Sequence, residues 1–126
     1  MEKSRPTALI RSGIVLVIAH DAGGAEILSS LLKSCKIKYK LSLAGPAIPI
    51  FERKLGNFEN FSLDEGIKFS DWVLTGTGWA SDFEYKGIRK AKDFGKFVAS
   101  FLDHWVNYKD RFVRNGVFVL PDEIWV

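Results

Sequence analysis

The stretch that decides the fold is IVLVIAHDAGGAEILSSLL, residues 14–32. Its first six residues are all apolar and rich in β-branched side chains, a pattern typical of a strand buried on both faces in a parallel sheet. The polar pair His20-Asp21 ends this run, and Gly23 and Gly24 follow it. Apolar residues then recur at helical spacing, which predicts an amphipathic helix. The stretch therefore predicts a strand, a tight turn and a helix.

The same alternation continues along the chain. Further strands are predicted at residues 38–43, 72–74, 97–102 and near the end of VFVLPDEIWV, with a short edge strand at 60–63. Helices are predicted at residues 50–55 and after Ser81, where Ser81 and Glu84 fit a capping box. This order predicts an α/β fold: a Rossmann-like, doubly wound, mainly parallel sheet of about five strands with helices on both faces.

The length and composition fit one globular domain. The chain has 126 residues, of which 47% are hydrophobic and 26% charged, values that exclude a disordered chain. We place a flexible lead at residues 1–12 and the domain at residues 13–126. The strand-like residues 124–126 end the chain without a turn or covering helix, so we expect the N-terminal part of a longer protein.

The net charge, the cysteine content and the N-terminal sequence limit the kinds of partner and compartment that we expect. The net charge of +3 is too small an excess to demand nucleic acid, so no nucleic-acid partner is predicted. The single cysteine, Cys35, excludes an internal disulfide and a cysteine-based zinc site, and it fits the cytoplasm. Arg11 interrupts the N-terminal apolar run, which is too short to cross a membrane, so membrane contact is peripheral at most.

Glycines follow two of the predicted strands, at the edge where open α/β sheets bind ligands. Gly23 and Gly24 stand where a helix begins, and a helix N-terminus favours an anion such as phosphate. The TGTG turn at residues 75–78 repeats this arrangement before the next helix. Each glycine pair is also compatible with a tight turn that binds no ligand.

The only two histidines, His20 and His104, each stand beside an aspartate at a predicted strand end. Three interpretations remain open: a general acid or base oriented by a carboxylate, a metal site, and structural hydrogen bonding of the turns. The metal site would use His20, Asp21, Asp103 and His104. Alternate strands lie about 10 Å apart, so these side chains would not converge and no metal is predicted.

Several familiar motifs are absent from the sequence. It has no G-x-G-x-x-G dinucleotide fingerprint, no P-loop and no G-x-S-x-G elbow, and no cofactor is predicted. A phosphoacceptor receiver domain would need an acidic pair after the first strand and an aspartate after the middle strand. His20-Asp21 and Thr75 occupy those places and disfavour that class.

Four segments together resemble the N-terminal half of GT-B-like bacterial glycosyltransferases and related polysaccharide-biosynthesis proteins, which are similar in fold to UDP-N-acetylglucosamine 2-epimerases. The segments are AHDAGGAEIL (19–28), VLTGTGWASDFE (73–84), FLDHWVNYKDRF (101–112) and LPDEIWV (120–126). The resemblance covers nearly the whole chain after Gly13. It implies the acceptor-side domain of a sugar-nucleotide-dependent glycosyltransferase in cell-surface polysaccharide biosynthesis, whose nucleotide-binding C-terminal domain is missing here.

The resemblance also implies the partners and the site. The partners would be a sugar nucleotide or phosphorylated sugar, an acceptor, and the missing C-terminal domain, without which the chain is expected to be inactive. His20 or Asp21 would supply a base to the acceptor hydroxyl. The catalytic candidates are His20, Asp21, Asp103 and His104; the ligand-binding candidates are Gly23, Gly24, Thr75, Gly76, Thr77 and Asn107.

Two other functions stay open. The chain could be a stand-alone, non-catalytic binding domain for a phosphorylated or anionic small ligand at the same two turns. It could also be an interaction module whose tryptophans form an exposed patch. A homodimer is compatible with an open sheet edge.

Overall fold

The fold is organised around a five-stranded, wholly parallel sheet. The computed structural model describes residues 10–78, 81–102 and 109–126. The strands are β1 (Val15–Ala19), β2 (Tyr39–Leu43), β3 (Trp72–Thr75), β4 (Phe97–Phe101) and β7 (Glu123–Trp125), in the spatial order β2-β1-β3-β4-β7. This is the flavodoxin-like doubly wound order, and it confirms the predicted fold class.

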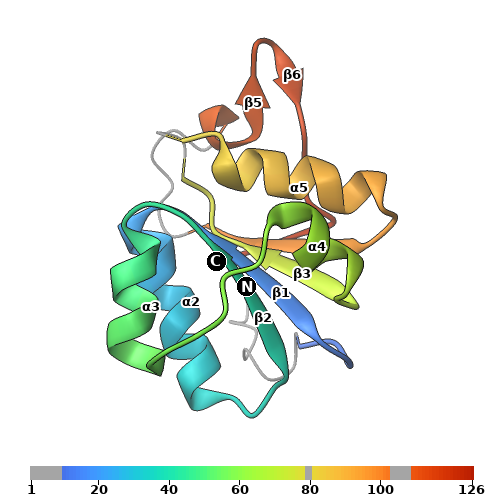
Figure 1. The fold of residues 1–126 in the computed structure, drawn as a ribbon. Helices are drawn as coiled ribbons and strands as arrows, with labels where there is room; N and C mark the ends of the chain where they lie inside the picture. Colours follow the sequence, from blue (N-terminus) through green and yellow to red (C-terminus); the bar gives the residue numbers. More distant parts are fainter. Residues whose placement is uncertain (1–9, 79–80, 103–108) are drawn as a thin grey trace.

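Helices cover both faces of the sheet (Figure 1). On one face lie α2 (Ala22–Ser34) and α3 (Ala47–Leu55), and on the other α4 (Leu63–Lys68) and α5 (Phe83–Asp93). Every β1 residue is fully buried because successive side chains enter opposite cores. Val15 and Val17 pack in the core that holds α2 and α3, whereas Leu16 and Ile18 pack in the core that holds α4 and α5.

Two predicted elements differ in their bounds. The helix expected at residues 50–55 begins at Ala47, because Pro46 and Pro49 fall at its N-cap and first turn, where proline is tolerated. The prediction of an edge strand at residues 60–63 was wrong. Only Asn60 forms an isolated bridge, and Ser62 caps a helix by accepting the Glu65 N–H.

The capping box predicted from Ser81 and Glu84 was also wrong. Helix α5 has Asp82 as its N-cap, one residue later than the box requires. The Ser81 hydroxyl instead accepts a hydrogen bond from the Phe83 N–H at 3.1 Å. Glu84 is only 1% exposed and bonds to backbone groups at the sheet edge.

The outer edge of β2 is covered by the amide side chain of Asn60. Its Oδ1 accepts from the Leu43 N–H at 2.7 Å, and its Nδ2 donates to the Leu43 carbonyl at 2.9 Å. The Ser42 hydroxyl adds a 2.8 Å bond to the Phe61 carbonyl. Asn60 therefore takes up the Leu43 N–H and carbonyl, which an additional strand would use.

The segment before β7 forms a small hairpin. A 3-10 helix, η1 (Lys109–Phe112), leads into β5 (Val113–Arg114) and β6 (Val117–Phe118). Asn115 and Gly116 have φ of 52° and 76°, as the two-residue turn between these strands requires. The hairpin projects beyond α5 in Figure 1.

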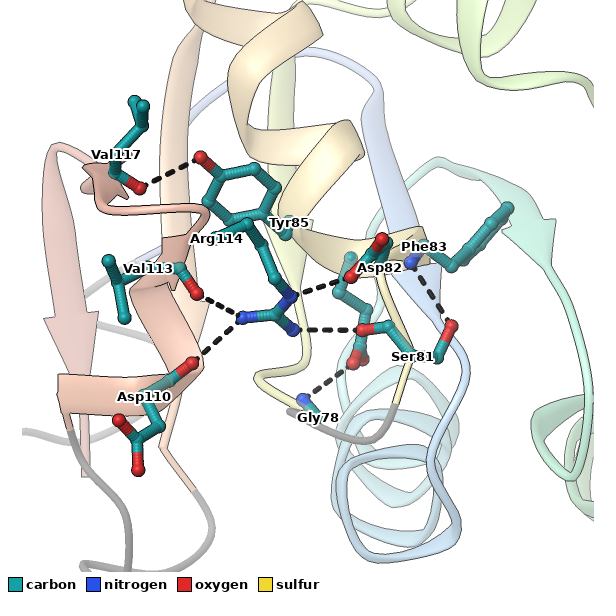
Figure 2. A network of polar contacts seen from close by, with 10 residues as sticks. Gly78, Ser81, Asp82, Phe83, Tyr85, Asp110, Val113, Arg114 and Val117 are labelled. Carbon is teal, nitrogen blue, oxygen red and sulfur yellow. Dashed lines mark hydrogen bonds and ion pairs between the residues drawn. The ribbon is translucent and has the colours of Figure 1, made fainter.

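Arg114 ties this hairpin to the start of α5 (Figure 2). Its Nε donates to Asp82 Oδ1 at 2.6 Å, and one terminal nitrogen donates to the Ser81 carbonyl at 3.0 Å. The Tyr85 hydroxyl adds a bond to the Val117 carbonyl at 2.9 Å.

None of the helices within the described ranges is long and apolar enough to cross a membrane.

Candidate functional site

The candidate site lies at the carboxyl ends of β1 and β3, where the winding of the sheet reverses. From β1 the chain passes into α2 on one face, and after β3 it passes into α5 on the other. Connections that diverge in this way leave a crevice outside the strand ends, the usual ligand site of open α/β sheets. β3 lies between β1 and β4, so the three strand ends predicted to carry the site share one edge of the sheet.

His20 and Asp21 form a side-chain pair at the end of β1. His20 Nδ1 lies 2.6 Å from Asp21 Oδ1, and the two side chains are 25% and 30% exposed. An ionised carboxylate can only accept a hydrogen bond, so Nδ1 is the donor in this pair, and the tautomer that carries its single proton there has its lone pair on Nε2. That arrangement gives His20 the form of an oriented general base.

The turn after β2 makes room for the imidazole. A Cβ on Gly45 would lie 2.6 Å from His20 Nε2, and Gly45 has a φ of +55°. The Ala47 N–H donates to the His20 carbonyl at 3.0 Å, which fixes the backbone of this residue. The ring therefore lies in a place that only a glycine at position 45 leaves open.

The first turn of α2 contains both predicted glycines. Gly23 is exposed, and Gly24 is buried with a Cβ position 3.4 Å from the Cα of Gly76. Asp21 is the N-cap but makes no side-chain cap bond, and the first turn carries no acidic residue. The N–H groups of a first turn have no acceptor within the helix, so this end of α2 is suited to an anion.

The turn at residues 75–78 uses its polar groups within the protein. The Gly76 N–H donates to the Ile18 carbonyl at 3.0 Å, and the Gly78 N–H donates to Glu84 Oε1 at 2.6 Å. Both threonine hydroxyls also have partners: Thr75 Oγ1 lies 2.5 Å from Ser100 Oγ, and Thr77 Oγ1 donates to the Phe101 carbonyl. This turn therefore differs from the start of α2, because its donors serve the fold.

Sequence reasoning assigned Glu84 only to a capping box and missed that its side chain touches both turns. Its Oε2 accepts the His20 N–H at 3.3 Å, and its Oε1 accepts the Gly78 N–H drawn in Figure 2. A Cβ on Gly76 would collide with this carboxylate, and a Cβ on Gly78 would collide with the carboxylate of Asp21. The two glycines of TGTG thus leave space for acidic side chains.

A buried arginine reaches the same edge from the segment before the hairpin. Arg111 is 7% exposed and donates to the Thr77 carbonyl at 2.8 Å and to Thr77 Oγ1 at 3.3 Å. Arg111 belongs to FLDHWVNYKDRF (101–112), one of the four segments that carry the resemblance, but the sequence analysis predicted no role for it. The remaining candidates, Asp103, His104 and Asn107, lie outside the described residues.

The described residues offer no cluster of metal-binding side chains at this site. Among residues 10–78, 81–102 and 109–126, no group of three or more histidine, cysteine, aspartate or glutamate side chains could hold a metal ion. One hollow of about 350 Å³ lies by the amino-terminal end of β4, away from His20. It is lined by Lys92, Gly95, Lys96, Phe97 and Asp122.

Comparisons of the chain with protein-family models, curated proteins and solved structures give no match. The likeness to glycosyltransferases therefore rests on the four sequence segments alone.

Proposed function

We propose that this chain is the acceptor-side domain of a GT-B-like, sugar-nucleotide-dependent glycosyltransferase, acting in cytoplasmic steps of polysaccharide biosynthesis. The observation that carries the proposal is the His20–Asp21 pair, 2.6 Å apart and partly exposed at the point where the winding of the sheet reverses. A hydroxyl acceptor needs such a base, and this is where an α/β sheet presents its ligand.

The chemistry assigns a separate task to each member of the pair. His20 Nε2 takes the proton of the acceptor hydroxyl as the hydroxyl oxygen bonds to the anomeric carbon of the donor. The bond from that carbon to the diphosphate breaks, and the diphosphate leaves with the electron pair. Asp21 holds the ring in the required tautomer and stabilises the imidazolium that forms.

The test uses the natural polypeptide that carries residues 1–126 and labelled UDP-, GDP- and CDP-sugars. We expect transfer of label to a sugar acceptor, and we expect His20→Ala and Asp21→Asn to lose transfer while retaining the circular dichroism spectrum of the fold. Full activity in both variants would reject this assignment of the site. Glu26→Gln is the matched control, because it also replaces a carboxylate by an amide on the same helix but lies outside the site.

A non-catalytic domain for an anionic small ligand is the second candidate. It is favoured by the start of α2, where Gly23 is exposed and the first turn contains no acidic residue. Calorimetry of the 126-residue chain with inorganic phosphate and UDP tests it. Binding that is unchanged in His20→Ala, combined with no transfer by the natural polypeptide, would favour this function over the transferase.

A further inference from the structure

Glu84 connects the two turns of the candidate site through the backbone. The residue lies in the first turn of α5, where the helix dipole favours a negative charge, and its side chain is 1% exposed. One carboxylate oxygen accepts the His20 N–H and the other accepts the Gly78 N–H, at 3.3 Å and 2.6 Å. One side chain thus joins the end of β1 to the end of the turn after β3.

The reversal of winding explains why these two N–H groups need a side-chain acceptor. A backbone bond joins the two turns, from the Gly76 N–H to the Ile18 carbonyl at 3.0 Å. Beyond it the chain leaves β1 and β3 toward opposite faces, so the regular ladder has no carbonyl to offer. Buried N–H groups require partners, and the Glu84 carboxylate supplies them.

The surrounding glycines leave room for this carboxylate. The three atoms nearest a Cβ on Gly76 would all belong to Glu84, and a Cβ on Gly24 would lie 3.9 Å from Glu84 Oε2. The carboxylate of Asp21 occupies the corresponding position beside Gly78. Asp21 therefore contacts the same turn whose last N–H group is held by Glu84.

We propose that Glu84 is a positioning residue: its carboxylate fixes His20 relative to Gly78, and thereby holds the His20–Asp21 pair in its hydrogen-bonded arrangement. The catalytic value of this arrangement rests on the proposed function. The positioning itself belongs to the 126-residue chain and can be measured without a sugar.

The experiment is nuclear magnetic resonance of the ¹⁵N-labelled chain. In the wild type we expect slow hydrogen exchange of the His20 and Gly78 amides and a single His20 tautomer protonated at Nδ1. In Glu84→Gln, one of the two accepting oxygens becomes an NH₂ group that can only donate, so one of the two N–H groups loses its acceptor. Exchange of that amide should accelerate about tenfold, and the His20 ring should become a mixture of tautomers.

Two variants separate positioning from general stability. Gly76→Ala should displace the carboxylate while Glu84 is retained, and should alter the His20 ring signals as Glu84→Gln does. Tyr85→Phe removes the neighbouring hydrogen bond to the Val117 carbonyl and should leave those signals unchanged.

The proposal is overturned when a folded Glu84→Gln or Gly76→Ala variant keeps the wild-type His20 ring signals. It is equally overturned when the His20 and Gly78 amides of the wild type exchange at unprotected rates, a measurement that needs no variant. A negative transferase assay with altered ring signals would reject the proposed function and leave the positioning role standing.

Discussion

The imidazole of His20 lies between the carboxylate of Asp21, 2.6 Å from its Nδ1, and the backbone of Gly45, where a Cβ would lie 2.6 Å from its Nε2. The two contacts come from turns after different strands, β1 and β2. The ring orientation is therefore set by the tertiary fold as well as by the adjacent residue in the chain.

The first prediction concerns catalysis by this ring. In the natural polypeptide, His20→Ala should lower kcat by about 10² to 10⁴, the usual contribution of a general base. Asp21→Asn should lower kcat as well, because the amide favours the wrong tautomer. Steady-state transfer rates measure both effects, and a variant that loses only acceptor affinity would contradict the base role.

The second prediction is a coupling between Gly76 and Glu84. Gly76→Ala should destabilise the chain by about 1–3 kcal/mol, because the added methyl group meets the Glu84 carboxylate. Glu84→Ala removes that obstacle, so the double variant should be more stable than the sum of the single effects by about 1 kcal/mol or more. Urea unfolding of the four proteins measures the cycle, and additive effects would contradict the contact.

The third prediction concerns the anchor of the hairpin. Arg114→Ala should cost about 2 kcal/mol of unfolding free energy, because a largely buried guanidinium loses charged and carbonyl partners. Arg114→Lys should recover little of it, since an ammonium cannot reproduce this planar set of bonds. As a control, Arg53→Ala should cost less than about 1 kcal/mol, because the Arg53 side chain is 61% exposed in its ion pair with Glu26.

The fourth prediction concerns acid stability between α2 and α3. Hydrogen bonds from the side chains of Lys54 and then Arg53 lower the pKa of Glu26 from its ordinary 4.5. A pKa depressed in the folded state gives stability that is complete above the unfolded pKa and is lost as pH falls through the folded pKa. The difference in urea midpoint between wild type and Glu26→Gln should therefore shrink below about pH 4.5.

Glu59→Gln is the control for that titration, because Glu59 is exposed and the change also removes one negative charge. A Glu26→Gln midpoint difference that stays constant from pH 7 to pH 3 would contradict the role of the ion pairs. A difference of equal size in Glu59→Gln would attribute the effect to net charge.

The central fold could be predicted because its signals are local. β1 is buried on both faces, so its residues are apolar without interruption, and the following helix has a clear apolar face. The α4 helix was missed because six residues with a single buried aliphatic side chain, Ile67, give no period to detect. The hairpin carried a recognisable signal in Asn115-Gly116, which was overlooked between short flanking strands.

The candidate site was harder to predict, because its main contacts join distant parts of the chain. His20 and Asp21 are adjacent, so their pairing was foreseeable. The contact between Glu84 and the His20 N–H spans 64 positions and depends on the reversal of winding, which no local pattern encodes. The role of Gly76 and Gly78 likewise follows from carboxylates that only the folded chain brings there.

The amide of Asn60 has a consequence for how molecules of this protein can associate. By pairing with Leu43 it imitates a neighbouring strand and blocks the β2 side of the sheet against a second molecule. Among the described residues, β7 has no strand on its outer side, and it offers only the three residues Glu123–Trp125. Within the part of the chain that the structure describes, the five-stranded sheet therefore offers only this short strand for edge-to-edge joining, and Asn60→Ala should promote aggregation by opening the β2 side.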